Sequence, residues 1–362
     1  MTSEEYNFLK DRNPDTKAVM SPYEIEELKT FPDKVYYKGE YCRRKIMALK
    51  SSDYHDPKNR YRIKKHDHIF YRYEVLDGLG KGAFGDVYLV YDHRDKITRA
   101  LKIIRSERRF VRQANTERNI LVKLAKTEVP NSSLLLDKFM FREHPCFVFE
   151  LYGLNLFQFM KLRKFKGLEI ERIKFYAKQI LQCLQAVHAQ NIIHCDLKPE
   201  NIVLTKKEES VKVIDFGSSC YVSTKNHSYI QSRYYRSPEI ILALGYNSSI
   251  DIWSFACIII EILTGEVIFP GSNESTMMEF FVQYLGHPDV DFAMKSPRIL
   301  KFFMYDGIDL NIYINVPRKP KSFEDILDKY SPDLTDLIKK CLTWYPSERL
   351  TASEALQHKF FK

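Results

Sequence analysis

The sequence has no long apolar run, no internal repeat and no low-complexity tract. Its longest apolar stretch, residues 252–260, is about half of the roughly 20 residues that a membrane-spanning helix needs, and it indicates a buried helix instead. The segment MTSEEYNFLKDRN at the start lacks the basic residues and the apolar stretch of a secretory signal. We therefore expect a protein of the cytoplasm, the nucleus or both, with no membrane partner.

Cysteine is scarce and scattered. The seven cysteines are odd in number and none stands in a CxxC pair, so the sequence indicates neither a disulfide framework nor a zinc site. We expect most of them to be buried thiols. The net charge of +9 favours anionic ligands or acidic partners but is far from a nucleic-acid-binding composition, and no nucleic-acid partner is expected. Two basic clusters, at 43–45 and 60–65, fit either a nuclear-import signal or a solvated basic face.

The pattern of apolar residues predicts a β-rich part followed by a mostly helical part. A chain of 362 residues exceeds the size at which a single core keeps growing, so two domains are expected. Residues up to about 65 are polar and interrupted by prolines, with one short helix capped by Ser21 and started by Pro22. Alternating residues then predict strands at 73–80, 86–92, 99–104, 134–141 and 146–150. Helical spacing predicts helices at 109–124, 170–189, 250–264, 275–285, 332–343 and 352–357.

A glycine-rich segment between two predicted strands is suited to covering phosphate groups. Gly80, Gly82 and Gly85 let the backbone approach an anion without side-chain obstruction, and their amides can point at it. Alone, such a triplet fits a glycine hairpin equally well. Lys102 in the third strand is at the right distance along the sequence to place an ammonium group on the phosphates, and Glu117 in the following helix to supply its carboxylate partner. Each residue alone would be a common surface residue.

The octapeptide HCDLKPEN at 194–201 and the tripeptide DFG at 215–217 complete a phosphoryl-transfer set. Asp196 is predicted to accept the hydrogen bond of a substrate hydroxyl, and Lys198 to stabilise the charge of the transferring group. Asn201 and Asp215 are the predicted ligands of Mg²⁺ bridging the phosphates of ATP. His194 is expected to be a packed core residue.

Residues that could enclose an adenine ring are placed by their offsets from these motifs. Core packing is an alternative explanation for each of the apolar ones. The set comprises Leu79, Val87, Ala100, Phe149, Glu150, Leu151 and Val203, with Glu150 and Leu151 offering backbone hydrogen bonds. Further along, Glu239 is expected to pair with Arg349 in a structural contact.

The motifs resemble those of eukaryotic protein kinases over residues 71–361, and four strings are similar to the dual-specificity tyrosine-phosphorylation-regulated kinases of the CMGC group, class II. These strings are HCD at 194–196, DFGSSC at 215–220, YIQSRYYR at 229–236 and HDHIFYRY at 66–73. The resemblance implies a bilobal α+β kinase fold, with a β-rich N-lobe carrying one main helix and a mostly helical C-lobe. It also implies an accessory extension with a homology box at 1–70, an N-lobe at 71–151 and a C-lobe at 152–362.

The same resemblance implies how the enzyme is activated and what it acts on. Tyr229 would be autophosphorylated in cis and its phosphate held by Arg233 and Arg236, because two guanidinium groups offer charge-assisted donors to a phosphate. The usual YxY string here begins with His227, so a single tyrosine remains. Packing of the Tyr229 ring against the lobe is the alternative. The implied substrates are serine and threonine residues of proteins, often before proline.

Residues 284–327 resemble the insert of this kinase group, which would be either a docking surface for a partner or merely a solvated surface. We expect a monomer. An active kinase using ATP and Mg²⁺ is the leading hypothesis. A pseudokinase scaffold is disfavoured because the whole catalytic set is present. A small-molecule kinase is disfavoured because it would lack the Ser237-Pro238-Glu239 segment.

Overall fold

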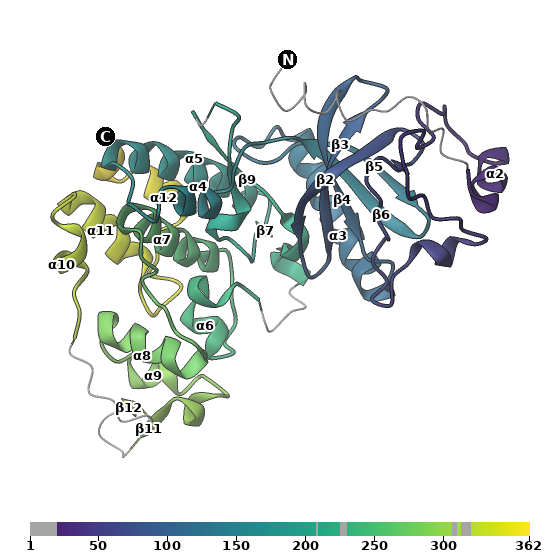
Figure 1. Ribbon diagram of the computed structural model, residues 1–362. Helices are drawn as coiled ribbons and strands as arrows, with labels where there is room; N and C mark the ends of the chain where they lie inside the picture. Colours follow the sequence, from purple (N-terminus) through teal and green to yellow (C-terminus); the bar gives the residue numbers. More distant parts are fainter. Residues whose placement is uncertain (1–19, 208, 225–229, 306–309, 313–319) are drawn as a thin grey trace. The chain divides into compact units, whose positions relative to one another are not determined.

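The computed structural model of the chain describes residues 20–207, 209–224, 230–305, 310–312 and 320–362. The chain forms two compact units, one of Met1–Val122 with Leu134–Leu151 and one of Lys123–Ser133 with Tyr152–Lys362. The first unit is rich in strands and the second is mostly helical (Figure 1). The predicted α+β class is therefore confirmed, and the domain boundaries 1–70, 71–151 and 152–362 stay a prediction.

The first unit is built on one six-stranded antiparallel sheet with the strand order β1-β2-β3-β4-β6-β5. Its strands are β1 (His68–Ile69), β2 (Tyr73–Lys81), β3 (Gly85–Asp92), β4 (Ile97–Ile104), β5 (Leu135–Phe141) and β6 (His144–Glu150). All five predicted strands are present. The short strand β1 was not predicted, because two residues are too few to show an alternating pattern.

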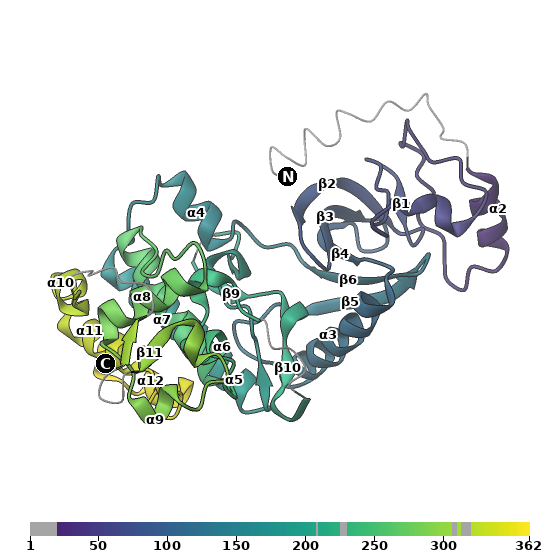
Figure 2. The same cartoon turned by 90° about the horizontal axis from the view of Figure 1, so that it is seen from below.

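A single long helix, α3 (Arg108–Lys126), follows β4, as the spacing of apolar residues predicted. Its apolar side is buried, including Ala114, Ile120 and Leu121. Both views show α3 running beside the sheet of the first unit (Figures 1 and 2). The helix thereby presents its inner side to β4, which is the arrangement needed for a contact between Lys102 and Glu117.

The extension before the sheet contains the predicted capped helix, α2 (Pro22–Lys29). Ser21 Oγ accepts the backbone N–H of Glu24 at 3.2 Å, and the Glu24 carboxylate accepts the N–H of Ser21 at 2.9 Å. This reciprocal capping box satisfies two amides that a helix start leaves unpaired. A 3-10 turn, η1 (Ser51–Tyr54), follows further along the extension.

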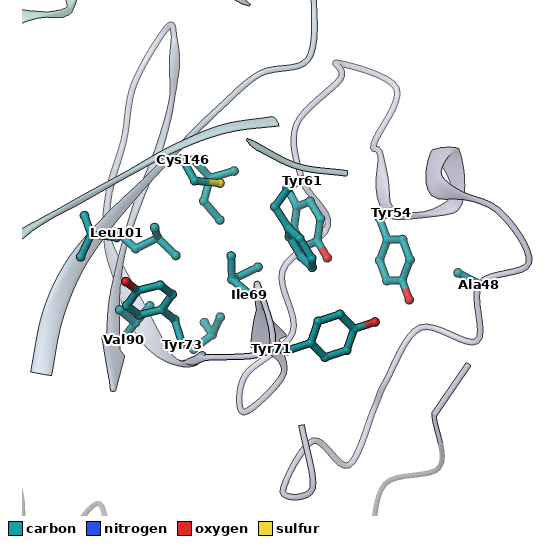
Figure 3. Close-up of a cluster of buried hydrophobic side chains, with 13 residues drawn as sticks. Ala48, Tyr54, Tyr61, Ile69, Tyr71, Tyr73, Val90, Leu101 and Cys146 are labelled. Carbon is teal, nitrogen blue, oxygen red and sulfur yellow. The ribbon is translucent and has the colours of Figure 1, made fainter. Parts of the chain in front are cut away.

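The extension shares a hydrophobic core with the sheet. Tyr54 and Tyr61 stack with ring centroids 5.7 Å apart, and both belong to the same buried cluster as Ile69, Val90 and Leu101 of the sheet. Figure 3 shows Tyr54, Tyr61 and Tyr71 on one side of this cluster and Tyr73, Val90 and Leu101 on the other, with Ile69 between them. Burying these rings stabilises the association of the extension with the sheet by the hydrophobic effect.

A buried network of charges also binds the extension to the sheet, and no sequence pattern predicted it. Arg142 in the β5–β6 turn donates to Glu27 at 2.7 Å, and its guanidinium lies 3.7 Å from the Tyr54 ring centroid. His68 Nε2 lies 2.8 Å from a Glu24 oxygen. Burial raises the pKa of Glu24, but His68 and Lys45 more than offset this and hold it at about 2. Glu24, Asp67 and His68 cluster as metal ligands can, yet Lys45 lies against both carboxylates, so cationic side chains already balance the charge.

The second unit is dominated by helices. They are α4 (Leu156–Leu162), α5 (Ile170–His188), α6 (Pro238–Ile241), α7 (Ser249–Thr264), α8 (Glu274–Leu285), α9 (Val290–Ala293), α10 (Phe323–Leu327), α11 (Pro332–Cys341) and α12 (Ala352–Leu356). Five of these were predicted within two residues at each end. Short strand pairs lie between them: β7 (Ile192–Ile193) with β10 (Cys220–Tyr221), β8 (Ile202–Leu204) with β9 (Val211–Val213), and β11 (Phe303–Tyr305) with β12 (Leu310–Ile312).

The core of the second unit forms around α7. Fifteen of its sixteen residues are buried, which agrees with its apolar composition, and Gly265 ends it in a left-handed conformation with φ of 85°. Helix α5 packs against α7 and α12. All seven cysteines are free, and all are buried, as expected. Within the described part of the chain, no helix has the length and apolar character needed to cross a membrane.

Candidate active site

The first unit brings Lys102 and Glu117 together. Lys102 lies in β4 and Glu117 in α3, and Lys102 Nζ donates to Glu117 Oε1 at 2.6 Å. The two side chains are 10% and 2% exposed. Because the pair is largely removed from water, the carboxylate holds the ammonium in a defined place. The predicted pairing of these two residues is therefore present.

The strand register places the predicted nucleotide-binding side chains on the same face of the sheet as Lys102. Val87 in β3 lies directly opposite Lys102, and Ala100 lies directly opposite Phe149 in β6. Residues that face each other across antiparallel strands, and residues two apart along one strand, point to the same side. Val87, Ala100, Phe149 and Lys102 thus share one face, with the first three partly accessible to solvent.

The glycine loop, residues 80–85, joins β2 to β3. The Gly82 N–H donates to the Gly85 carbonyl at 2.9 Å and closes the turn. A Cβ at Gly85 would lie 2.2 Å from the Ile103 carbonyl oxygen, so only glycine fits there. A Cβ at Gly80 would meet nothing within 4 Å. Leu79, next to the loop, is 44% exposed, so its side chain is accessible to a ligand.

In the second unit, Asp196 is held from three sides. Its Oδ2 accepts Lys198 Nζ at 2.6 Å. Its Oδ1 accepts both the backbone N–H of Ser232 at 3.1 Å and the Ser232 hydroxyl at 2.8 Å. Asn201 Nδ2 donates to the Asp196 carbonyl at 2.8 Å. The carboxylate is therefore fixed in orientation while 17% of the side chain remains exposed. Ser232 was not among the predicted site residues, although it lies inside the string YIQSRYYR that carried the resemblance.

Asp215 stands at the end of β9 in an unusual backbone conformation. Its φ of 63° and ψ of 73° lie in the left-handed region, and its Oδ1 accepts the Gly217 N–H at 3.4 Å. The next residue, Phe216, is buried with its ring centroid 5.0 Å from that of His194. His194 Nε2 lies 3.1 Å from the Ile214 carbonyl oxygen, so His194 is the packed core residue that was expected. A left-handed conformation is strained for a residue other than glycine and persists only where the surrounding packing holds it.

Asp251 holds the backbone of residues 194–195 and is a site residue that the sequence motifs did not indicate. It lies in the first turn of α7 and accepts the N–H groups of His194 at 2.8 Å and Cys195 at 3.0 Å. His188 Nε2 lies 2.9 Å from its Oδ2. Burial raises the pKa of the Asp251 carboxyl, but the bonds from His188 and His194 prevail and keep it below its ordinary value. An acid just inside a predicted helix was the signal available, but only the fold shows what it binds.

Gln231 is a second anchor that the sequence analysis did not single out. It is buried with φ of 65°, and its backbone N–H donates to the Cys195 carbonyl at 3.0 Å. Its side-chain amide donates to the Ile250 carbonyl at 2.9 Å and to Ser254 Oγ at 2.8 Å. The segment around Gln231 is thereby tied to α7 and to the backbone at residue 195.

The predicted activation residues are placed differently from one another. Tyr229 and His227 lie outside the described residues. Arg233 is exposed. Arg236 is buried, donates to the Gln231 carbonyl at 2.8 Å and lies 3.5 Å from a Glu274 oxygen.

The remaining predicted residues lie within the core or at its surface. Glu239 and Arg349 form the expected contact, with two bonds of 2.6 and 2.7 Å between fully buried side chains. Val203 in β8 is 7% exposed. Glu150 is exposed and Leu151 half-buried at the end of β6.

Comparison with known proteins agrees with these features. The family described as "Protein kinase domain" matches residues 73–361. A human protein named dual specificity tyrosine-phosphorylation-regulated kinase 4 is 41% identical over 353 residues, which cover 94% of this chain and 68% of the human protein. The Drosophila dual specificity tyrosine-phosphorylation-regulated kinase 2 is 39% identical over 95% of this chain, and the fission yeast DYRK-family kinase pom1 is 40% identical over 95%. This chain spans 49% and 33% of those two proteins.

Proposed function

Because the chain belongs to the protein kinases and, among them, to the dual-specificity tyrosine-phosphorylation-regulated kinases, we propose a role for each site residue in the transfer of the γ-phosphoryl group of ATP to protein hydroxyls. Protein kinases use ATP and act on proteins. The observation that carries the proposal is the fixed Asp196 carboxylate with Lys198, Asn201 and Ser232 around it.

Asp196 is the proposed base. One of its oxygens would accept the proton of a substrate hydroxyl, and the bonds from Ser232 and Lys198 keep the carboxylate from rotating away. Lys198, 2.6 Å from the same carboxylate, would stabilise negative charge on the transferring phosphoryl oxygens. Since both groups are already in place, little reorganisation is needed when a substrate binds.

Asn201 and Asp215 are proposed to hold Mg²⁺. Both offer oxygen ligands, which are the donors that this ion prefers. The Asn201 amide nitrogen is committed to the Asp196 carbonyl, so the amide oxygen is turned away from that carbonyl and can serve as a ligand. Mg²⁺ bound to ATP neutralises charge on the phosphates and orients them. The residues present therefore fit the ion.

The first unit is proposed to bind the nucleotide. Lys102, held by Glu117, would pair with the α- and β-phosphates, and the glycine loop would cover them. Val87 and Ala100 share the face of Lys102 and would contact the adenine, together with Leu79 and Phe149. Val203, which belongs to the second unit, is proposed for the same role. Glu150 and Leu151 would offer their backbone groups to the base.

Activation is proposed to proceed by phosphorylation of Tyr229 in cis. Arg233 is the exposed guanidinium nearby in the sequence, so it is the better placed of the two arginines to receive the phosphate. Arg236 already supports the Gln231 backbone and would contribute mainly by holding that segment in shape. Proline-directed substrates, a docking surface in 284–327, a monomeric state and action in the cytoplasm or nucleus remain part of the proposal.

Incubation with labelled Mg-ATP and a generic basic protein tests this assignment. Wild type should transfer label, whereas Asp196→Asn and Asp215→Ala should each abolish transfer because one lacks the base and the other a metal ligand. Asp289→Asn serves as a control, since Asp289 is an exposed carboxylate that accepts the Tyr345 hydroxyl. Undiminished transfer by Asp196→Asn would refute the role of Asp196, and no transfer by wild type under any condition would indicate a scaffold.

A further inference from the structure

Arg60, a side chain of the extension, binds the glycine loop. Arg60 Nη2 donates to the Gly82 carbonyl at 2.8 Å, and Arg60 Nη1 forms an ion pair with Asp86, the residue after the loop. The Asp86 side chain is 8% exposed and that of Arg60 is 24% exposed. Arg60 was assigned by sequence to a basic cluster that fits an import signal or a solvated face, and the structure gives it a specific contact instead.

The backbone that carries Arg60 is itself fixed. Asp56 Oδ1 accepts the N–H groups of Lys58 at 2.7 Å and Arg60 at 2.8 Å, which closes a tight turn. The Lys58 carbonyl accepts Arg105 Nε at 2.8 Å. The Asn59 carbonyl accepts the Ser106 N–H at 3.1 Å. Arg60 therefore reaches the loop from a turn that is tied to the residues just after β4, so the backbone that carries it is already ordered.

The contact of Arg60 sets the direction of the loop amides. In a planar trans peptide the carbonyl and the following N–H point to opposite sides. When Arg60 binds the Gly82 carbonyl, the Ala83 N–H is directed away from Arg60. The Phe84 carbonyl accepts the Arg105 N–H at 3.0 Å, so the Gly85 N–H is likewise directed to the side opposite Arg105. Fixed amides of this kind bind anions without paying for reorganisation.

The contact of Arg60 also neutralises the Asp86 carboxylate beside the loop. Asp86 adjoins a loop that would cover phosphates, and a carboxylate there repels them unless a cation balances it. Without Arg60 the Asp86 carboxylate would be buried and would lose the ion pair that balances it. Removal of Arg60 would leave the loop amides without a fixed direction and the Asp86 carboxylate without its cation. Both effects weaken the binding of a nucleoside triphosphate.

We propose that Arg60 is a positioning residue for nucleotide binding, through which the extension sets the affinity of the kinase for ATP. The inference rests on the proposed role of the glycine loop. Arg60 itself does not touch the reacting atoms. It acts on the loop carbonyl and on Asp86, so its effect falls on binding of ATP rather than on the transfer step.

The test compares Arg60→Ala, Arg60→Lys and the double variant Arg60→Ala/Asp86→Ala with wild type. Arg62→Ala is the matched control, because Arg62 lies in the same segment and its guanidinium donates to the Asp53 carbonyl at 3.2 Å rather than to the glycine loop. For each purified full chain, the KM for ATP and kcat are measured with the basic protein substrate. The Kd for a non-hydrolysable ATP analogue and the Tm are measured alongside.

Arg60→Ala should raise the KM for ATP and the Kd for the analogue about fivefold, the change that corresponds to one hydrogen bond of ordinary net strength, with kcat within about twofold. Arg60→Lys should lie between this variant and wild type. The double variant should bind more tightly than Arg60→Ala, since the unbalanced acid is gone. Arg62→Ala should match wild type.

A KM for Arg60→Ala within about twofold of wild type at an unchanged Tm would overturn the proposal. So would a double variant that binds no better than Arg60→Ala. If Arg60→Ala proves unstable, the Kd of Arg60→Lys decides, and a value equal to wild type overturns the proposal. Failure of wild type itself to bind the analogue would instead refute the proposed function of the loop.

Discussion

Replacing Asp251 by asparagine should loosen the backbone of residues 194–196 and lower both the free energy of unfolding and kcat. The two oxygens of Asp251 accept three bonds, from the N–H groups of His194 and Cys195 and from His188, at 2.8 to 3.0 Å. The substitution keeps the shape of the side chain but turns one acceptor into an N–H₂ group. That group would face a donor in a site where Asp251 is fully buried.

The expected cost follows from these contacts. A hydrogen bond to a charged group contributes about 1.5–3 kcal/mol, and a buried donor left unpaired adds its desolvation penalty. Loss of one or two of the three bonds thus predicts a decrease of about 3–5 kcal/mol in the free energy of unfolding. A domain of ordinary stability, about 5–15 kcal/mol, would still fold. The backbone of His194 and Cys195 would move, and Asp196 follows them directly in the chain.

Urea unfolding followed by circular dichroism measures the first effect, and steady-state phosphate transfer measures the second. We expect a lower unfolding midpoint and a kcat reduced at least tenfold, on the order of 1.4 kcal/mol in the barrier. Asp289→Asn, an exposed aspartate to asparagine change, should alter neither. A free energy of unfolding within about 1 kcal/mol of wild type, together with an unchanged kcat, would refute the anchoring role.

Three further outcomes are expected. Arg349→Met should lower the free energy of unfolding by about 3–5 kcal/mol in urea titrations because Glu239 stays buried without its partner, and Glu239→Leu/Arg349→Met should recover most of that loss. Burial raises the pKa of Glu261 to about 7 despite its bond from Tyr235. The stabilising contribution of Glu261 is therefore full below about pH 4.5 and is lost as the pH rises to 7. The free energy of unfolding, measured between pH 5 and 8, should show this fall in wild type and not in Glu261→Gln. Intact-mass analysis after bacterial expression should find phosphate on Tyr229 in wild type, and phosphate there in Asp196→Asn would contradict phosphorylation in cis.

Sequence reasoning worked best where a pattern is local. The five strands of the sheet, the long helices and the Ser21 cap were all predictable, because alternation, helical spacing and capping act within a few residues. The pair of Lys102 and Glu117 was also predictable, since the two residues stand at the offsets of the phosphoryl-transfer motifs. The class of fold followed from the same signals.

Apart from the pair of Glu239 and Arg349, which a motif indicated, contacts between distant segments were not predictable from the sequence. Arg142 binding Glu27, Asp251 binding the backbone of residues 194 and 195, and Arg60 binding Gly82 each join residues more than twenty positions apart. An arginine in a polar stretch carries the same local signal whether it is solvated or buried. Its partner is decided by chain packing, which a single sequence does not display.

By itself, the sequence determined which chemical groups are available to this protein and which short elements carry them, because side-chain chemistry and backbone preference are properties of neighbouring residues. The tertiary structure alone decided which of those groups are buried, what holds them still and which backbone carbonyls they orient. The physical reason is that burial and long-range pairing arise only when the packed chain excludes water, and that exclusion is what makes a charge pair or a fixed amide effective.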